Sequence, residues 1–183
     1  PITGVIDTLA TMPGTERVGT RWLAFPPMMV VGPSADRLFT AETGSDSIVV
    51  TQYDGTRLGV LRSGLERDAV PQDVIDRAAA QRYSPEVPSL YPHFARLLPD
   101  RTGNLWVMAY PRIEAGNSYW HPEWGVSNGA DWVVLDPSGR RIAQVRTPPG
   151  LRVLEIGDDY VIGVVNEDVN VESIRLYAMH KQT

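Results

Sequence analysis

The residues best suited to chemistry lie in one aromatic stretch of the chain. Residues 111–130 read PRIEAGNSYWHPEWGVSNGA and combine aromatic rings with a histidine and a glutamate. The candidate binding residues of this stretch and its flanks are Tyr110, Tyr119, Trp120, His121, Glu123, Trp124 and Trp132. Amphipathic rings beside His and Glu are typical of surfaces that bind a protein partner, a carbohydrate or a ring-shaped ligand. The same rings could instead form a small satellite core that holds the loop on the domain, so both interpretations stay open.

The chain lacks the residues that several common kinds of catalytic site and metal site require. The chain has no cysteine, which excludes thiolate nucleophiles, Cys-ligated zinc, iron–sulfur clusters and disulfides. Neither a GxSxG elbow nor an HExxH pair occurs, and His121-Pro-Glu123 is not a metal-binding motif. Ser138 lies in a DPSG sequence that is typical of a turn. The sequence therefore favours a binding protein over an enzyme, with no cofactor and no metal.

Charge and hydrophobicity narrow the set of partners. The 183 residues include 22 acidic and 17 basic side chains, for a net charge of -5, and no basic stripe is visible, so nucleic acid is not an expected partner. No apolar run reaches about 18 residues, the length that spans a bilayer, so no transmembrane segment is expected. The chain begins at Pro1 and not at Met. An upstream piece that was processed off, trimmed or left out would explain this, and that piece could have been a signal or anchor. An extracytoplasmic location, periplasmic or secreted, is the favoured expectation.

The elements that must position the aromatic stretch are short strands in a repeated order. The expected strands are residues 27–31, 37–42, 47–53 and 57–62 in a first unit, 94–98, 104–110, 131–136 and 141–146 in a second, and 152–156, 160–166 and 173–179 in a third. Between two of them, Asp54-Gly55 predicts a hairpin turn of type I′, with positive φ at both central positions. The sequence therefore predicts an all-β fold in which one module, residues 1–183, contains units at 21–62, 90–148 and 150–181.

One short helix is expected in the loop between the first two units. Residues 69–83 read AVPQDVIDRAAAQRY, and Pro71 suits the first turn of a helix. The apolar residues that share one face of this helix are Val70, Val74, Ile75 and Ala78. Two prolines follow within the next residues and end the helical pattern.

The line DRTGNLWV at residues 100–107 resembles the D-x-x-G-N-L-W-V line of six-bladed β-propellers of the TolB-like and NHL-like type. The third unit, with GDDYVIGVV and SIRLYAM, is similar to the closing blade of such propellers. The chain as a whole resembles about half of one. The resemblance implies about three blades, each a four-stranded antiparallel sheet. It also implies that Gly103 permits a tight turn and that Leu105 and Trp106 pack between neighbouring blades.

The resemblance also implies where the insertions lie. In propellers, loops from a fourth strand to the next first strand, and from a second to a third strand, emerge on one face. Residues 65–89 and 111–130 are insertions of these two kinds, so they are expected on one face together. Some six-bladed propeller enzymes hold a divalent cation with Glu, Asn and Asp ligands. Glu86, Asn128 and Asp131 have the right types, but their spacing does not single them out.

Residues 4–12 resemble the outermost strands that follow Gly55 and Gly139, yet no inner strands precede them. The third unit in turn lacks a fourth strand. Propellers commonly close by pairing an N-terminal strand with the last blade, but three blades do not make a ring, since propellers have about four to eight. Three arrangements stay open: two chains joined head to tail that exchange their first strands, a fragment or truncated relative of a longer propeller, or a large partner that covers the open faces.

The expected function is that of a non-catalytic binding or scaffolding module that docks on a partner protein or on a second copy of itself. Such a module suits an accessory subunit of an extracytoplasmic or membrane-bound assembly, for example an energy-transducing complex. The alternative is a propeller that binds or hydrolyses a small molecule or a carbohydrate, using the aromatic loop and the central channel.

Overall fold

The computed structural model describes residues 24–80, 87–112, 127–168 and 171–180, together with Thr8, Thr11, Arg17–Val18 and Arg21–Trp22. The strands are β1 (Arg17–Val18), β2 (Arg21–Trp22), β3 (Met29–Pro33), β4 (Leu38–Glu42), β5 (Ser47–Thr51), β6 (Arg57–Arg62), β7 (Phe94–Pro99), β8 (Leu105–Ala109), β9 (Asp131–Leu135), β10 (Arg141–Arg146), β11 (Leu151–Ile156), β12 (Tyr160–Asp168) and β13 (Val171–Ala178). One helix, α1, spans Gln72–Ala80. No helix among the described residues is long and apolar enough to cross a membrane.

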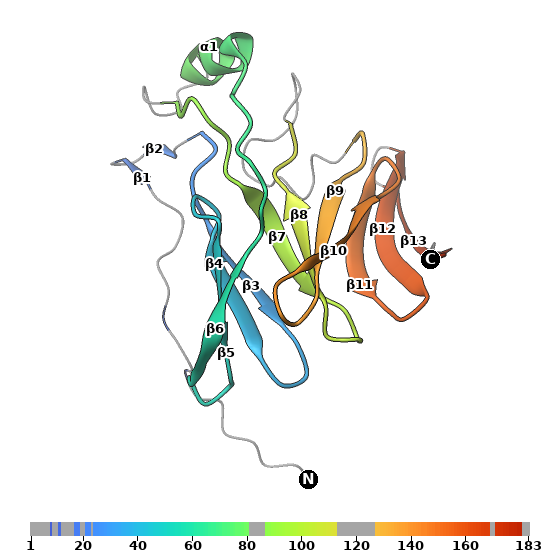
Figure 1. Cartoon of the computed structure of the whole chain (residues 1–183). Helices are drawn as coiled ribbons and strands as arrows, with labels where there is room; N and C mark the ends of the chain where they lie inside the picture. The colour runs from blue at the N-terminus through green and yellow to red at the C-terminus, as the bar shows by residue number, and fades with distance from the viewer. Residues whose placement is uncertain are drawn as a thin grey trace.

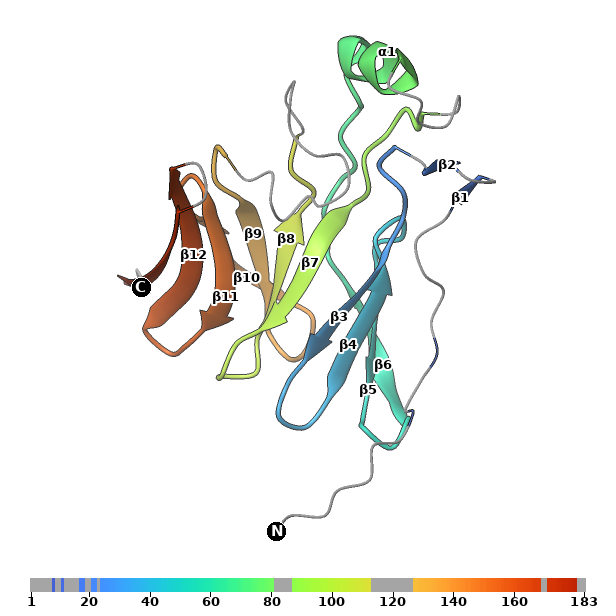
Figure 2. The same ribbon diagram turned by 180° about the vertical axis from the view of Figure 1, so that it is seen from behind.

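β1 and β2, of two residues each, pair with one another. The other described strands form three antiparallel sheets, with the orders β3-β4-β5-β6, β7-β8-β9-β10 and β11-β12-β13. We call these sheets blade 1, blade 2 and blade 3. They follow one another around an open arc with blades 1 and 3 at its two ends (Figure 1, Figure 2). Gly32 in β3 lies so near β7 that an added Cβ would come within 3.0 Å of Pro99 Cδ. The predicted all-β fold of propeller-like blades with one short helix is confirmed.

Apolar side chains fill the two spaces between neighbouring blades. Between blades 1 and 2 the buried residues are Phe39, Ala41, Ile48, Val50, Phe94, Leu97, Leu105, Val107, Val133 and Leu135. Between blades 2 and 3 they are Ala95, Trp106, Met108, Ala130, Trp132, Val134, Leu151, Val153, Ile156 and Val165. Successive residues of β8 alternate between the two clusters because strand side chains point to opposite faces. Burial on both faces explains why β8 and β9 are nearly unbroken apolar runs.

The line at residues 100–107 has the architectural role that the sequence predicted. Gly103 takes a φ of 87° in the turn between β7 and β8, a conformation that costs glycine little. Leu105 packs towards blade 1 and Trp106 towards blade 3. The carboxylate of Asp100 then ties the turn to the strand, because it accepts hydrogen bonds from Thr102 N, Thr102 Oγ1, Asn104 N, Asn104 Nδ2 and Trp106 Nε1 over 2.8–3.1 Å.

The turn between β9 and β10 repeats this design. Asp136 accepts from the backbone and the hydroxyl of Ser138, at 3.0 and 2.6 Å, and from the backbone of Arg140 at 3.0 Å. The turn thus accounts for Ser138, as the sequence predicted. The hydrogen bond from the Ser138 hydroxyl is the main reason why the pKa of Asp136 falls to about 2. Burial of Asp100 opposes its ionisation, but hydrogen bonds from Asn104, Thr102 and Trp106 outweigh it and hold the pKa of Asp100 below its usual value.

These two carboxylates predict an acid-sensitive fold. Each has a lower pKa in the folded chain than the value of about 3.9 expected when unfolded. Their contribution to stability is therefore present above the unfolded pKa of about 3.9 and is lost as the pH falls through each folded-state pKa, which is about 2 for Asp136. We expect Asp100→Asn with Asp136→Asn to be less stable than the wild type at pH 7 and to show a shallower loss between pH 4 and pH 2 in urea titrations. Asp73→Asn, at an exposed ion pair of α1, is the matched control, and a double variant with the wild-type slope would contradict the assignment.

Most strands lie within two residues of their predicted bounds, and the differences have local causes. β3 runs to Pro33, two residues beyond the prediction, because an edge strand tolerates a residue without an N–H. β5 ends at Thr51, two residues early, because Gln52 N donates to Thr56 O and begins the turn. The predicted type I′ turn is wrong: of Asp54 and Gly55, only Gly55 has a positive φ.

The predicted outer strand at residues 4–12 lies outside the described residues, apart from Thr8 and Thr11. Both of these threonines are exposed, and neither belongs to a strand. Blade 3 has three strands among the described residues, as predicted, and β13 is its outermost strand. The edge of β13 therefore has no paired strand within the described part of the chain.

Candidate functional site

The described residues of the two insertions, 65–80 with 87–89 and 111–112 with 127–130, lie at one edge of the blades, as the resemblance implied. α1 and the ends of β8 and β9 that border the second insertion lie on the same side of the molecule, opposite the β7–β8 turn (Figure 1, Figure 2). An ion pair joins the two segments directly: Arg112 Nε lies 3.0 Å from Asp68 Oδ2. We call this side of the molecule the docking edge.

A small apolar cluster holds α1 on the docking edge. Its buried members are Ala24, Phe25, Val70, Val74, Ala78 and Tyr91, with Ile75, Val87 and Tyr110 packed around them. All four residues predicted on the apolar face of α1 are therefore in this cluster. The ring of Tyr91 meets Phe25 edge-on, with centroids 4.9 Å apart, and stacks on Tyr110 at 5.5 Å. These contacts pack α1 against Phe25 and Tyr91.

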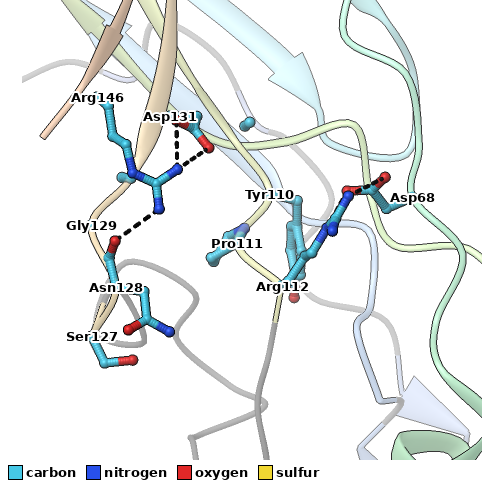
Figure 3. Close-up of a pocket in the computed structure, with 11 residues that line it drawn as sticks. Asp68, Tyr110, Pro111, Arg112, Ser127, Asn128, Gly129, Asp131 and Arg146 are labelled. Atoms are coloured by element: carbon cyan, nitrogen blue, oxygen red, sulfur yellow. Dashed lines mark hydrogen bonds and ion pairs between the residues drawn. The ribbon is translucent and has the colours of Figure 1, made fainter. Parts of the chain in front are cut away.

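A cleft of about 450 Å³ opens beside this cluster. The residues that line it include Asp68, Tyr110, Pro111, Arg112, Asn128, Gly129, Asp131 and Arg146 (Figure 3). Arg146 Nη1 donates to both carboxylate oxygens of Asp131, at 3.1 and 3.0 Å, and Arg146 Nη2 donates to the carbonyl of Asn128 at 3.0 Å. The strand ends β9 and β10 thus position one guanidinium of the cleft, while the end of β8 positions the other.

The cleft is polar, and its charges are paired. The hydrogen bond to Asp68 raises the pKa of the Arg112 guanidinium, so this group stays charged at any physiological pH. Burial, together with the neighbouring Tyr91, raises the pKa of Tyr110, which keeps its phenol neutral. The arrangement presents alternating positive and negative groups that can bind a charged or hydroxyl-rich surface.

The described residues of the cleft do not form a metal site. No group of three or more His, Asp or Glu side chains in the described ranges comes close enough to hold a metal ion. Of the residue types that six-bladed propeller enzymes use for a cation, Asn128 and Asp131 do lie together in the cleft. Asp131, however, is paired with Arg146. Glu86 lies outside the described residues.

The seven predicted binding residues divide into three groups. Tyr119, Trp120, His121, Glu123 and Trp124 lie outside the described residues. Tyr110 lines the cleft, but its ring packs in the cluster under α1, which agrees with the satellite-core alternative for this residue. Trp132 is buried between blades 2 and 3, where its ring meets that of Trp106 edge-on at 6.4 Å. For the group as a whole, binding stays a prediction.

Sequence reasoning missed the charged residues of the cleft. Asp68, Arg112 and Arg146 were not among the candidates, and Asp131 was considered only as a metal ligand. Asp68 and Arg112 are 44 residues apart, and exposed charges follow no hydrophobic period. The one available signal was their position, since Asp68 and Arg112 lie in the insertions and Arg146 ends the strand that pairs with Asp131. The sequence matches no protein-family model and no curated protein.

Proposed function

We propose that this chain is a non-catalytic binding or scaffolding module that docks on a partner protein with the docking edge. The observation that carries the proposal is the presence of two solvent-exposed ion pairs, Arg112–Asp68 and Arg146–Asp131, around one cleft at that edge. The line DRTGNLWV at residues 100–107 supports placing the chain among six-bladed propellers of the TolB-like and NHL-like type.

These ion pairs contribute little to the stability of the fold. An exposed pair contributes about 0–1 kcal/mol to stability. Arginine is enriched at protein interfaces, and charges at an interface set the rate and the specificity of encounter. The cluster under α1 holds the docking edge in place before a partner arrives, which lowers the entropy lost on binding. Recognition therefore accounts for the arrangement better than stability does.

Charge reversal in the cleft tests the proposal. We expect Arg112→Glu with Arg146→Glu to reduce the amount of partner retained by the immobilised chain at least about tenfold, which corresponds to about 1.4 kcal/mol. The midpoint of urea denaturation should change little, because both side chains are exposed. The measurement is quantitative mass spectrometry of the proteins retained from an extract of the source cells.

Two further variants make this test specific. Arg101→Glu breaks an exposed ion pair with Glu155, of 2.7 Å, in the β7–β8 turn on the opposite side, and should leave the retained proteins unchanged. The swap Asp68→Arg with Arg112→Asp keeps an ion pair but inverts its direction, so it should lose the partner while remaining folded. Equal retention by the wild type, the cleft variants and Arg101→Glu would refute the docking edge.

A small-molecule or carbohydrate ligand is the second candidate, favoured by the cleft itself. Its volume of about 450 Å³ lies in the range of about 300–1,000 Å³ found for ligand sites. Under this alternative, a sugar or metabolite library should contain a compound that raises the thermal midpoint of the wild type and not of Arg146→Glu. The proteins retained by the chain should then be the same for both.

A further inference from the structure

Equivalent positions in the three blades can be matched through the turn before each second strand. One backbone hydrogen bond closes each turn, from Ser34 N to Arg37 O, from Asp100 N to Asn104 O and from Gly157 N to Tyr160 O. The second residue after the acceptor is Phe39, Trp106 or Ile162, and its partner on the third strand is Val50, Val134 or Leu176. This correspondence shows which surface each blade turns towards the next.

Blade 3 exposes the face that the other blades bury against a following blade. Val50 and Val134 are only 5% and 3% exposed, whereas Leu176 at the same position is 69% exposed. Two residues before Val134 and Leu176 stand Trp132, 1% exposed, and Ile174, 76% exposed. Blade 3 therefore carries the apolar residues of a blade–blade contact without a following blade among the described residues.

Blade 1 exposes an apolar residue on the complementary face, next to Thr40, which is itself buried. The third residue after the acceptor of each turn is Thr40, Val107 or Gly163. Its partner on the first strand of the same blade is Val31, Leu97 or Val153, respectively. Leu97 and Val153 are each 2% exposed, because the preceding blade covers them, but Val31 is 47% exposed. The two ends of the arc thus present the two halves of the contact that the chain already makes twice internally.

A groove of about 630 Å³ lies between blade 2 and the segment that follows β13. The residues that line it include Trp106, Val134, Ile142 and Val145 from blade 2, with Met179 and His180 from the segment that follows β13. In blade 2 the residue before the fourth strand, β10, contacts blade 1: an added Cβ on Gly139 would lie 3.0 Å from Leu61 Cδ2 in β6. The counterpart of Leu61 in blade 2 is Val145, and it lines the groove. A fourth strand for blade 3 would fill this groove.

Residues 4–12 have the sequence of such a fourth strand. GVIDTLATMPG, from Gly4, aligns with RRIAQVRTPPG, from Arg140, so that Leu9 matches Val145 and Thr11 matches Thr147. Thr147 is buried, and its hydroxyl accepts from Ala130 N at 3.0 Å. Blade 1 has a buried hydroxyl at the corresponding place, that of Ser63, which donates to Asp46. Thr11 is exposed in the single chain.

We propose that a second copy of this chain covers both ends of the arc, head to tail. Blade 1 of each copy packs on Ile174 and Leu176 of the other, and residues 4–12 of each copy pair with β13 of the other. The product is a six-bladed ring with two identical contacts, which is a closed head-to-tail assembly. Six lies within the usual range of about four to eight blades.

A second copy covers the exposed residues of both blade 1 and blade 3, whereas a strand from the same chain covers only the edge of blade 3. Pairing of residues 4–12 with β13 of the same chain would fill the edge but leave Ile174 and Val31 uncovered. In the ring, blade 1 of one copy lies beside blade 3 of the other, so residues 13–23 need to bridge only neighbouring blades. This contact is separate from the docking edge at α1.

Solution mass tests the proposal, measured by light scattering on the full chain. We expect the wild type to have twice the mass of one chain, and Ile174→Glu and Val31→Glu each to have the mass of one. An equimolar mixture of these two variants should recover the double mass, because one wild-type contact remains. Leu58→Glu, at an exposed residue of β6, is the control and should keep the double mass.

A crosslink provides the second measurement. The chain has no cysteine, so a chain with Leu9→Cys can be mixed with a chain with Ile174→Cys, the positions that match the paired Val145 and Trp132. We expect a disulfide between the two chains on mild oxidation, within the Cα separation of about 4.4–6.8 Å that a disulfide allows. A third chain carries both substitutions. If a disulfide forms within this chain and none forms between the two singly substituted chains, the proposal is overturned. A wild type with the mass of one chain would overturn it as well.

The outcome is independent of the proposed docking function. A single-chain mass with loss of a partner in the cleft variants would refute only the ring. A double mass in the wild type and in the cleft variants, with no change in retained proteins, would refute only the docking edge. A dimer that Ile174→Glu disrupts and Val31→Glu does not would indicate contact between two copies of blade 3, which also overturns the head-to-tail ring.

Discussion

Trp132→Ala is expected to lower the free energy of unfolding by about 3–5 kcal/mol, the cost of removing a large buried aromatic side chain. The ring is 1% exposed and lies between blades 2 and 3. Its removal would leave a cavity beside Trp106, and both the transfer free energy and the lost contacts favour the wild type. Urea denaturation followed by circular dichroism gives the measurement.

Two controls give that result its meaning. Trp132→Phe should lose much less stability, because it keeps an aromatic ring and because the indole Nε1 has no hydrogen-bond partner in the described part of the chain. Leu58→Ala removes an exposed side chain and should change stability by no more than about 0.5 kcal/mol. A loss below about 1 kcal/mol in Trp132→Ala would mean that the ring does not pack between the blades.

The second large effect is expected at Gly129. Gly129→Ala should cost about 2–6 kcal/mol, since a non-glycine residue at positive φ costs about 1–3 kcal/mol and overpacking adds about 1–3 kcal/mol. Gly129 has a φ of +85°, and an added Cβ would lie 2.3 Å from the carbonyl oxygen of Thr147. The backbone must move to relieve this contact, which disturbs the hydrogen bonds between Thr147 and Ala130.

Gly55→Ala separates the two causes. Gly55 has nearly the same φ, +87°, but an added Cβ would meet no atom within 4 Å, so only the conformational cost remains. The difference between the two variants in urea denaturation measures the clash alone. Equal losses would show that the backbone of Gly129 does not approach Thr147. Because Gly129 lines the cleft, Gly129→Ala should also reduce partner retention.

The strands could be predicted from the sequence because burial and pairing leave a local signal. β8 and β9 are short apolar runs between turn residues, and Asp100 and Gly103 mark a turn whose geometry needs those two residue types. α1 could be predicted because its buried residues recur at helical spacing. Asp54 and Gly55 predicted the hairpin but not its turn type, which depends on backbone hydrogen bonds to Gln52 and Thr56 that the sequence does not show.

The cleft could not be predicted, because its residues come together only through the fold. Arg112 and Asp68 are joined by the way α1 packs on Tyr91, and exposed charges leave no periodic pattern. Trp132 was predicted as a binding residue because of its residue type, but it is buried. Its position in the apolar run DWVVL is the signal that indicates a core residue. An aromatic residue in a buried strand and one in a loop therefore need separate interpretation.

The two apolar clusters share no residue, and only blade 2 contributes to both. The chain therefore behaves as a linear array in which each blade is coupled to its nearest neighbours. Within the described part of the chain, a substitution in blade 1 reaches blade 3 through the packing of blade 2. In the head-to-tail ring this line would become a circle, and every blade would gain a second route of coupling to every other blade.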